Sequence, residues 1–301
     1  YAMTAAARAL EEHERISLTG LLLVGFGVKM AIFPLHLWLP DAHSIAPMPV
    51  TVLLAAAMLG MGAYGILLLP IGVLGGVGIR ALQAPLMAIA LCSEAFGAFM
   101  CLWAHDIKRL VAYSSVSQMG YILFALCTLT PRGVAGGVLH VLTHGLIKGA
   151  LFMGVGLVMQ ATGRRNMAEM GGLLRPVAGS RSELVVGGLA VGALAIAGAP
   201  PFGAFHSEWL ILSGGLGAGP QGLAYLQFLA PLLTAMYALW FVARLAFGAA
   251  PEGLAPHPLP GSMWAAFVAA LVGALVVGVL PQPFYHWSFA AASQVLSGVA
   301  P

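Results

Sequence analysis

Long apolar stretches recur along the chain, and short links rich in glycine, proline or charge separate them. A helix needs about 20 consecutive apolar residues to cross the hydrocarbon core of a bilayer, and eight stretches reach that length. They cover residues 17–39, 48–69, 83–104, 107–128, 134–159, 184–213, 222–248 and 262–281. The pattern predicts an all-α fold, a polytopic transmembrane helix bundle of eight spans. The tail 282–301 carries Trp and Tyr, which favour a membrane interface.

Two of these stretches contain signals that interrupt a helix. Pro34 lies inside the first stretch and removes a backbone hydrogen bond near residue 30. Pro200 and Pro201 lie inside the sixth, with Gly198 close by. Non-helical backbone is tolerated at membrane depth where protein buries it or water reaches it. We therefore expect two discontinuous helices, with ordinary proline kinks as the alternative.

Ionisable residues lie beside both predicted breaks. Lys29 precedes the first break, and His206 and Glu208 follow the second. Charged side chains inside a membrane are costly, and they usually face a protein interior or a water-filled path. Discontinuous helices with charges at corresponding places in two halves indicate an ion pathway near the bilayer midplane. Glu94 is a further carboxylate inside an apolar stretch, and it is either part of such a path or neutralised by a proton.

A polar stripe follows one face of the fifth predicted helix. His140, His144 and Lys148 are spaced at i, i+4 and i+8, which places them on one face. Histidine exchanges protons near neutral pH, so the stripe predicts a proton relay. The alternative is a set of polar side chains that join helices by hydrogen bonds. His-x-x-x-His also suits zinc, but no third ligand or metalloprotease glutamate accompanies it, so no metal is expected.

Composition agrees with a membrane protein and excludes several function classes. Of 301 residues, 60% are hydrophobic and 8% are charged, whereas soluble domains carry about 25% charged residues. The net charge of +3 is too small and dispersed for nucleic-acid binding. The chain lacks motifs for flavin, haem or iron–sulfur clusters, so no cofactor is expected. The three cysteines lie in apolar stretches without a CxxC spacing and are expected to be buried thiols.

Basic residues divide unequally between the two membrane faces. Eight crossings place seven of them on one face: Lys108, Arg109, Arg164, Arg165, Arg175, Arg181 and Arg244. The other face receives four: Arg8, Arg15, Arg80 and Arg132. Because cytoplasmic loops carry the excess of Lys and Arg, we expect the first face to be cytoplasmic and both ends of the chain to be outside. Residues 1–16 are polar, so no signal peptide is expected.

Four motifs occur in a characteristic order along the chain: "GVKMAIFPLHLWLPDAHSIAP", "HDIKRLVAYSSVSQMGY", "HVLTHGLIKGALF" and "GAPPFGAFHSEWLI". With these motifs nearly the whole chain resembles the antiporter-like membrane subunits of respiratory complex I, a family shared with Mrp antiporters and membrane-bound hydrogenases. The resemblance implies that Lys29 is the central lysine of the first broken helix. It also implies that Glu208 occupies the Lys or Glu position of the second. The His140–Lys148 stripe matches the polar helix between them.

The resemblance implies two inverted five-helix repeats. On that map residues 1–69 hold a polar segment and the last two helices of the first repeat. Residues 83–248 would be the second repeat and the proton-conducting half, and residues 262–301 a C-terminal helix with an interfacial tail. Gly60 departs from the family pattern, because many members have a lysine there, and Glu94 is not typical of its helix.

Together these features predict a proton-translocating, non-redox subunit of a redox-driven translocase, resembling complex I or a membrane-bound hydrogenase. Its partners would be other membrane subunits, the lipid bilayer and protons, in a prokaryotic cell membrane. Two alternatives remain at this stage. An Mrp-type exchanger subunit would also move Na⁺, which carboxylates suit, although Lys and His are in the majority here. A structural scaffold with a degenerate channel would move no ion.

Overall fold

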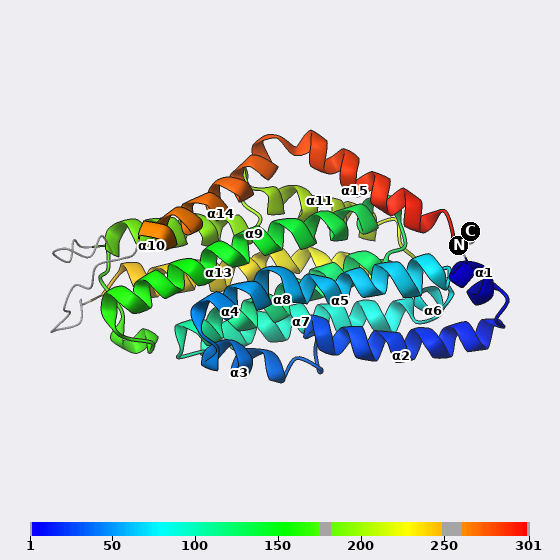
Figure 1. Cartoon of the computed structure of the whole chain (residues 1–301), viewed down its shortest axis with the longest axis horizontal. Helices are drawn as coiled ribbons and strands as arrows, with labels where there is room; N and C mark the ends of the chain where they lie inside the picture. The colour runs from blue at the N-terminus through cyan, green and yellow to red at the C-terminus, as the bar shows by residue number, and fades with distance from the viewer. Residues whose placement is uncertain (1, 175–181, 249–260, 300–301) are drawn as a thin grey trace.

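The computed structural model describes residues 2–174, 182–248 and 261–299, and within them the chain is a helical bundle without β-strands (Figure 1). The helices, with π- or 3-10-segments marked η, are α1 (Ala2–Arg8), α2 (Glu12–Met30), α3 (Trp38–Ile45), α4 (Met48–Leu53), η1 (Leu54–Met58), α5 (Leu59–Ile66), η2 (Leu67–Val73), α6 (Val77–Ala81), α7 (Gln83–Trp103), α8 (Ile107–Cys127), α9 (Pro131–Thr162), η3 (Met167–Glu169), α10 (Ser182–Ile196), α11 (Gly203–Gly215), α12 (Gln221–Leu226), η4 (Gln227–Leu229), α13 (Ala230–Ala246), α14 (Gly261–Val279) and α15 (Pro281–Leu296).

Six of the eight predicted spans are continuous in the described residues. They are long and apolar enough to cross a membrane: Met48–Val73, Gln83–Trp103, Ile107–Cys127, Pro131–Thr162, Gln221–Ala246 and Gly261–Val279. The other two predicted spans are each divided into shorter helices, α2 with α3 and α10 with α11. The bundle therefore does not contain eight continuous spans, and the two exceptions are the stretches with predicted breaks.

The first break is held by contacts that replace the missing helical hydrogen bonds. Helix α2 ends at Met30, and Ala31 adopts a left-handed conformation with φ of 57°. The indole nitrogen of Trp38 donates to the carbonyl of Val28 at 2.8 Å, which ties α3 back to α2. The backbone N–H of Phe33 donates to Ser93 Oγ at 3.2 Å. Neighbouring elements thus satisfy unwound backbone at membrane depth, as an apolar environment requires.

The second break separates α10 from α11. Helix α10 ends at Ile196, and Gly198 adopts φ of +69°, a conformation that glycine takes with little strain. Helix α11 begins at Gly203, and the N–H of Phe202 donates to Ala199 O at 3.1 Å within the turn. Both predicted discontinuities are therefore present.

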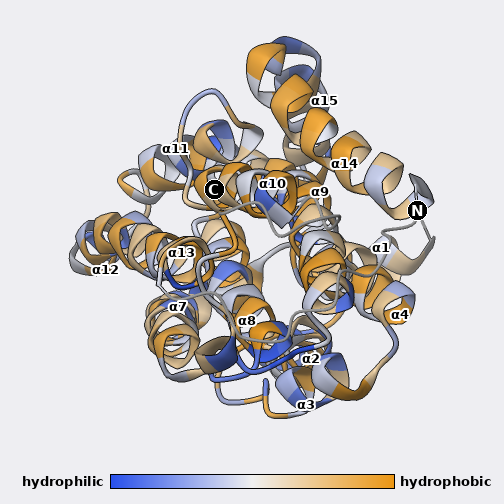
Figure 2. Cartoon of the chain, turned by 90° about the vertical axis from the view of Figure 1, so that its left-hand side faces the viewer, coloured by the Kyte–Doolittle hydropathy of each residue, from blue (hydrophilic) through white to orange (hydrophobic). Residues whose placement is uncertain are grey.

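Helices α8 and α9 form the centre of the bundle. Helix α8 packs between α7 and α9, and α9 also contacts α10, α11, α14 and α15. Seen along the bundle, the outer helices are mostly apolar, and hydrophilic segments gather near α8 and α3 (Figure 2). Outward-facing side chains such as Leu21 and Trp103 are 72% and 75% exposed, as expected of a lipid-facing surface. Cys101 and Cys127 are buried as predicted, but Cys92 is exposed because it lies on the outer side of α7.

The predicted interfacial tail is a helix. Helix α15 bends away from α14 and continues towards the end of the bundle that holds α1, in contact with α9 and η2 (Figure 1). Trp287 on this helix is 52% exposed, whereas Ser288 is buried. Helix α1 and the end of α15 lie at the same end of the bundle, in agreement with both chain ends on one face. Two of the seven basic residues used for the orientation, Arg175 and Arg181, lie outside the described residues.

Candidate functional site

The polar stripe of α9 points into the protein. His140 and Lys148 are fully buried, and His144 is 2% exposed. The ring centroids of His140 and His144 are 6.5 Å apart. Two turns of helix therefore carry three titratable groups inside the bundle, facing α8.

Lys148 is solvated by the backbone and a hydroxyl of α8. Its ammonium donates to Val111 O at 3.1 Å and to Ser114 Oγ. Among the described residues no carboxylate forms an ion pair with it. A buried cation without a counter-ion is costly, so the free energy of burying the charge favours release of its proton.

His140 contacts one hydroxyl and one amide. Its Nδ1 lies 2.9 Å from Ser207 Oγ, and its Nε2 lies 2.8 Å from Gln118 Oε1. Ser207 Oγ can donate its proton to Ala204 O, at 3.0 Å, and then accept from a protonated His140. Alternatively, the hydroxyl can rotate and donate to a neutral ring. The site therefore accommodates both charge states of His140 with only a hydroxyl rotation.

Hydroxyl and amide groups extend this network from α8 to α13. Gln118 Nε2 lies 3.4 Å from Thr234 Oγ1 and 3.5 Å from Tyr237 Oη, and Tyr121 Oη lies 3.2 Å from the same threonine hydroxyl. The Tyr121 ring also stacks on His140, with centroids 5.6 Å apart. Sequence analysis did not single out these groups.

The polar residues of α8 could have been found from the sequence, because they form a second periodic stripe. Ser114, Gln118 and Tyr121 are spaced at i, i+4 and i+7 and share one face of α8. This face meets the His140–Lys148 stripe, so the two central helices place polar faces against each other.

Two buried carboxylates lie beyond His140. Glu208 is 4% exposed, and its Oε1 has no hydrogen-bond partner in the described structure. Glu94 is 1% exposed, and its Oε1 accepts from Gln227 Nε2 at 3.0 Å. The two carboxylates lie within electrostatic range of each other. The structure thus brings Glu94, Glu208 and the α9 stripe into one buried region.

Gly198→Ala is expected to lower both the melting temperature and any transport by the complex. The Glu208 carboxylate occupies the space that a Cβ at residue 198 would need, and alanine at positive φ costs about 1–2 kcal/mol. Thermal unfolding of the purified complex measures the first effect. Gly187→Ala is the matched control, because nothing lies within 4 Å of its Cβ position. Equal melting temperatures for the two variants would contradict this explanation.

Two predicted site residues lie apart from the buried cluster. Lys29 is half-buried near the end of α2, and it forms no hydrogen bond or ion pair with any described residue. His206 is half-buried on α11, with Nδ1 2.7 Å from Tyr285 Oη and Nε2 2.9 Å from Gly278 O. A neutral ring that donates to the carbonyl and accepts from the phenol satisfies both contacts. His206 therefore joins α11 to α14 and α15.

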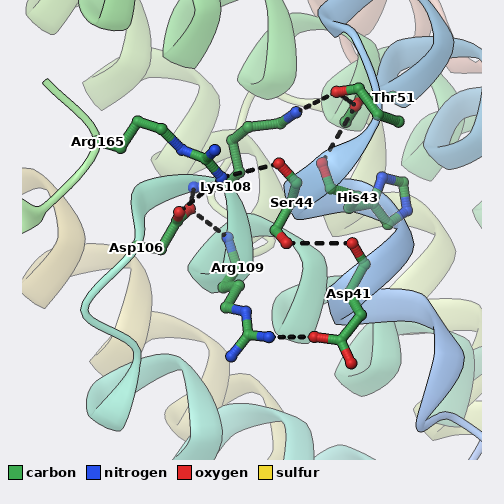
Figure 3. A network of polar contacts seen from close by, with 9 residues as sticks. Asp41, His43, Ser44, Thr51, Asp106, Lys108, Arg109 and Arg165 are labelled. Atoms are coloured by element: carbon green, nitrogen blue, oxygen red, sulfur yellow. Dashed lines mark hydrogen bonds and ion pairs between the residues drawn. The ribbon is translucent and has the colours of Figure 1, made fainter. Parts of the chain in front are cut away.

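A charged network lies at the start of α8 (Figure 3). Asp106 caps the helix, because its Oδ1 accepts from the N–H groups of Lys108 and Arg109 at 2.8 and 3.1 Å. Its Oδ2 pairs with Arg165 at 2.7 Å. Asp106 is therefore the N-cap of α8, and three of the basic residues assigned to one membrane face, Lys108, Arg109 and Arg165, meet here.

The same network fixes the end of α3. Arg109 pairs with Asp41, Arg165 donates to Ser44 O at 2.8 Å, and the Lys108 ammonium donates to Ala46 O at 2.6 Å. Cations beside carbonyls at a helix C-terminus are favourable. Asp41 thus ties the discontinuous helix to α8 (Figure 3).

His43 lies between this network and Lys148. Its ring is fully buried, stacks on Phe152 with centroids 5.0 Å apart, and lies within electrostatic range of both Lys108 and Lys148. Neither ring nitrogen has a hydrogen-bond partner among the described residues. His43 therefore extends the polar groups from Lys148 to the bundle end.

Unpartnered buried atoms cluster along this line. Buried polar groups without protein partners are normally satisfied by internal water. Those found here are both ring nitrogens of His43, His144 Nε2, Glu208 Oε1, Glu94 Oε2 and Gln227 Oε1. Water at these positions would join neighbouring titratable groups. Along α8 the line from Lys108 to Tyr121 spans 13 residue-to-residue steps, or about 20 Å at 1.5 Å per residue.

Comparison with known proteins shows the family to which this chain belongs. A family profile described as NADH:quinone oxidoreductase/Mrp antiporter, transmembrane, matches residues 2–234. The chain belongs to this family. A relative named hydrogenase-4 component F homolog, from Methylacidiphilum infernorum, is 40% identical over 218 residues, which cover 71% of this chain and 44% of the relative. The chain thus spans less than half the length of that protein.

Solved structures share the fold of this family member. A chain of respiratory complex I from Thermus thermophilus with bound NADH superposes with a TM-score of 0.86 and 27% identity, over 97% of this chain and 61% of the other. A chain of an archaeal membrane-bound sulfane sulfur reductase, described as a respiratory membrane complex, gives 0.83 and 28% over 99% and 61%. The protein is thus a multi-pass membrane protein with the antiporter-like fold.

Proposed function

We propose that this chain translocates protons as a non-redox subunit of a redox-driven membrane complex. The observation that carries the proposal is the buried line of titratable groups from Lys108 and His43 through the α9 stripe to Glu208. Members of the line are joined by hydroxyls and amides that can donate or accept. Such a line suits protons, which pass from group to group without a wide pore.

Electrostatics provides a way to load and unload the path. Among the described residues, the Lys148 ammonium donates its hydrogen bonds to neutral oxygens alone. A change in nearby charge therefore changes the free energy of keeping its proton. When a nearby carboxyl group loses its proton, its negative charge stabilises the protonated form of Lys148. When that carboxylate takes up a proton, this stabilisation is lost and Lys148 releases its proton. Partner subunits would carry out electron transfer and drive this exchange.

The names of similar proteins support a redox-driven complex. Respiratory complex I and the archaeal sulfane sulfur reductase are both described as respiratory, and the family profile names NADH:quinone oxidoreductase first. We extend this context to the present chain and propose other membrane subunits as its partners. Residues 83–248, which include α7 to α13, would be the conducting unit because they hold every member of the buried line except His43.

Sodium exchange is the second candidate function. Three unpartnered oxygens, on Glu94, Glu208 and Gln227, are hard ligands that suit a small cation. Within the described residues, however, no group of three His, Cys, Asp or Glu side chains is arranged to hold a metal ion. The imidazole and ammonium groups that make up the rest of the line favour protons.

Proton uptake by vesicles that contain the whole complex separates these functions. During redox turnover, uptake in sodium-free buffer that a protonophore abolishes is the expected result. Uptake that appears only after sodium is added would favour the exchanger. If variants of the buried line change uptake under neither condition, the chain is a scaffold.

Lys29→Ala is expected to lower this sodium-free uptake strongly while leaving the complex assembled. Lys29 is the residue before the last one of α2 and has no hydrogen-bond or ion-pair partner among the described residues. We therefore propose that its ammonium acts through its charge and not through packing. Vesicle uptake and the yield of assembled complex measure the two effects. Val28→Ala, one residue earlier on α2, is the control. Uptake equal in the two variants would remove Lys29 from the path.

A further inference from the structure

Glu94 is a buried carboxylate on the largely apolar helix α7. It is the one acidic residue of α7, and its side chain points inward rather than toward lipid. Helix α8 makes room for it at Gly120, where a Cβ would lie 2.6 Å from Glu94 Cγ. The close approach of the two helices thus depends on a glycine opposite a glutamate. Burying a carboxylate in such a site costs free energy, and acidic residues inside membrane helices usually have a function.

The polar partner of Glu94 supplies one hydrogen bond and leaves two acceptors unfilled. Gln227 is fully buried and donates from Nε2 to Glu94 Oε1 at 3.0 Å. Glu94 Oε2 and Gln227 Oε1 are both buried and have no partner among the described residues. These two oxygens both accept hydrogen bonds, and one donor placed between them would satisfy both. A proton on Glu94 Oε2 provides that donor and removes the buried charge.

Glu208 is a second buried carboxyl group with an unpartnered oxygen. It is buried, its Oε1 is unpartnered, and α11, which carries it, packs against the η4 segment of Gln227. Among the described residues no Lys or Arg forms an ion pair with either glutamate. Two carboxylates within electrostatic range in a low-dielectric interior repel each other when both are ionised. The pair therefore favours holding at least one proton.

The carboxyl pair is connected to the α9 stripe through Tyr121. This phenol lies within electrostatic range of both glutamates, and its ring stacks on His140. Its hydroxyl contacts Thr234 Oγ1 at 3.2 Å, and the same hydroxyl lies near Gln118. Tyr121 is therefore close both to His140 and to the two glutamates.

We propose that Glu94 and Glu208 form a two-carboxyl proton store beyond His140, with Gln227 as the positioning residue that binds the acid form of Glu94. In one state Glu94 is the acid and Glu208 the carboxylate. When one proton passes between them, Glu208 becomes the acid and Glu94 the carboxylate, so charge and protons balance. This inference rests on the proposed function, because it assigns a step to the same path.

Infrared difference spectroscopy of the whole complex in vesicles tests the store. The wild type is expected to show a buried carboxylic-acid carbonyl band that Glu94→Gln removes. Gln227→Leu, which keeps the carboxyl but removes the amide hydrogen bond, is expected to shift the band to higher frequency. Glu169→Gln, an exposed partner of Arg164, is the control that should leave the band unchanged.

Proton uptake measured on the same vesicles separates the two proposals. Glu94→Gln is expected to retain partial uptake, several-fold below the wild type, because Glu208 still accepts protons. A wild type that pumps, with a band unaffected by Glu94→Gln and Gln227→Leu, would overturn the store and leave the proposed function standing. A wild type that does not pump would overturn the proposed function itself. Loss of the band on addition of sodium alone would show a cation site instead and overturn the store.

Discussion

Glu208→Gln is expected to lower redox-driven proton uptake by about 100-fold, since a positioned proton donor or acceptor contributes about that much to a transfer rate. Glutamine has the size and shape of glutamate, so it still fits against Gly198 at the second break. It cannot release or accept a proton. The carboxylate lies on α11 next to Ser207, which contacts His140, so its loss interrupts the relay directly after the α9 stripe.

Uptake by vesicles and the yield of assembled complex together check this prediction. Glu208→Asp keeps a carboxyl group on a shorter stem and is expected to retain part of the activity. Trp209→Phe, at the neighbouring lipid-facing position, is the control for changes in α11. Wild-type uptake in Glu208→Gln would exclude this carboxylate from the path.

Lys148→Met is expected to reduce uptake to a similar extent without destabilising the complex. Methionine follows much the same course through the core but carries no charge. A buried charge without a counter-ion is itself costly, so an apolar side chain in its place removes that cost. The main cost is the loss of the hydrogen bonds to Val111 O and Ser114, about 1 kcal/mol each. The two possible roles of Lys148, proton carrier and structural link, therefore predict different combinations of proton uptake and melting temperature.

The melting temperature of the complex is measured alongside its uptake. Leu151→Met, a buried change on the same helix, controls for altered packing of α9. Lost uptake with a melting temperature near that of the wild type supports a proton carrier. Retained uptake with a clear drop in melting temperature would instead show that Lys148 joins α9 to α8.

The apolar pattern located the main elements because hydrophobic length is the dominant requirement of a membrane span. It also located both breaks, since Pro34 and the Pro200–Pro201 pair cannot continue a helix. The grouping of His140, His144 and Lys148 followed from the helical repeat alone. These features depend on local sequence, and local sequence was sufficient.

The partners across the bundle could not be predicted in the same way. Gln227 and Thr234 are isolated polar residues in apolar surroundings, and only the packing of α12, η4 and α13 brings them to α7 and α8. The rotation of a helix about its axis also depends on packing. For this reason His206 faces α14 and α15, although it lies two residues from Glu208.

The central claim is that Lys148 and Glu208 act on one continuous path, and the number of protons taken up per electron pair tests it most directly. The measurement compares the wild-type complex with Lys148→Met, Glu208→Gln and the double variant in sodium-free vesicles. Residues that act as one unit are not additive. The account predicts the same low ratio in all three variants. Two partial losses that add in the double variant, or a ratio unchanged from the wild type, would contradict it.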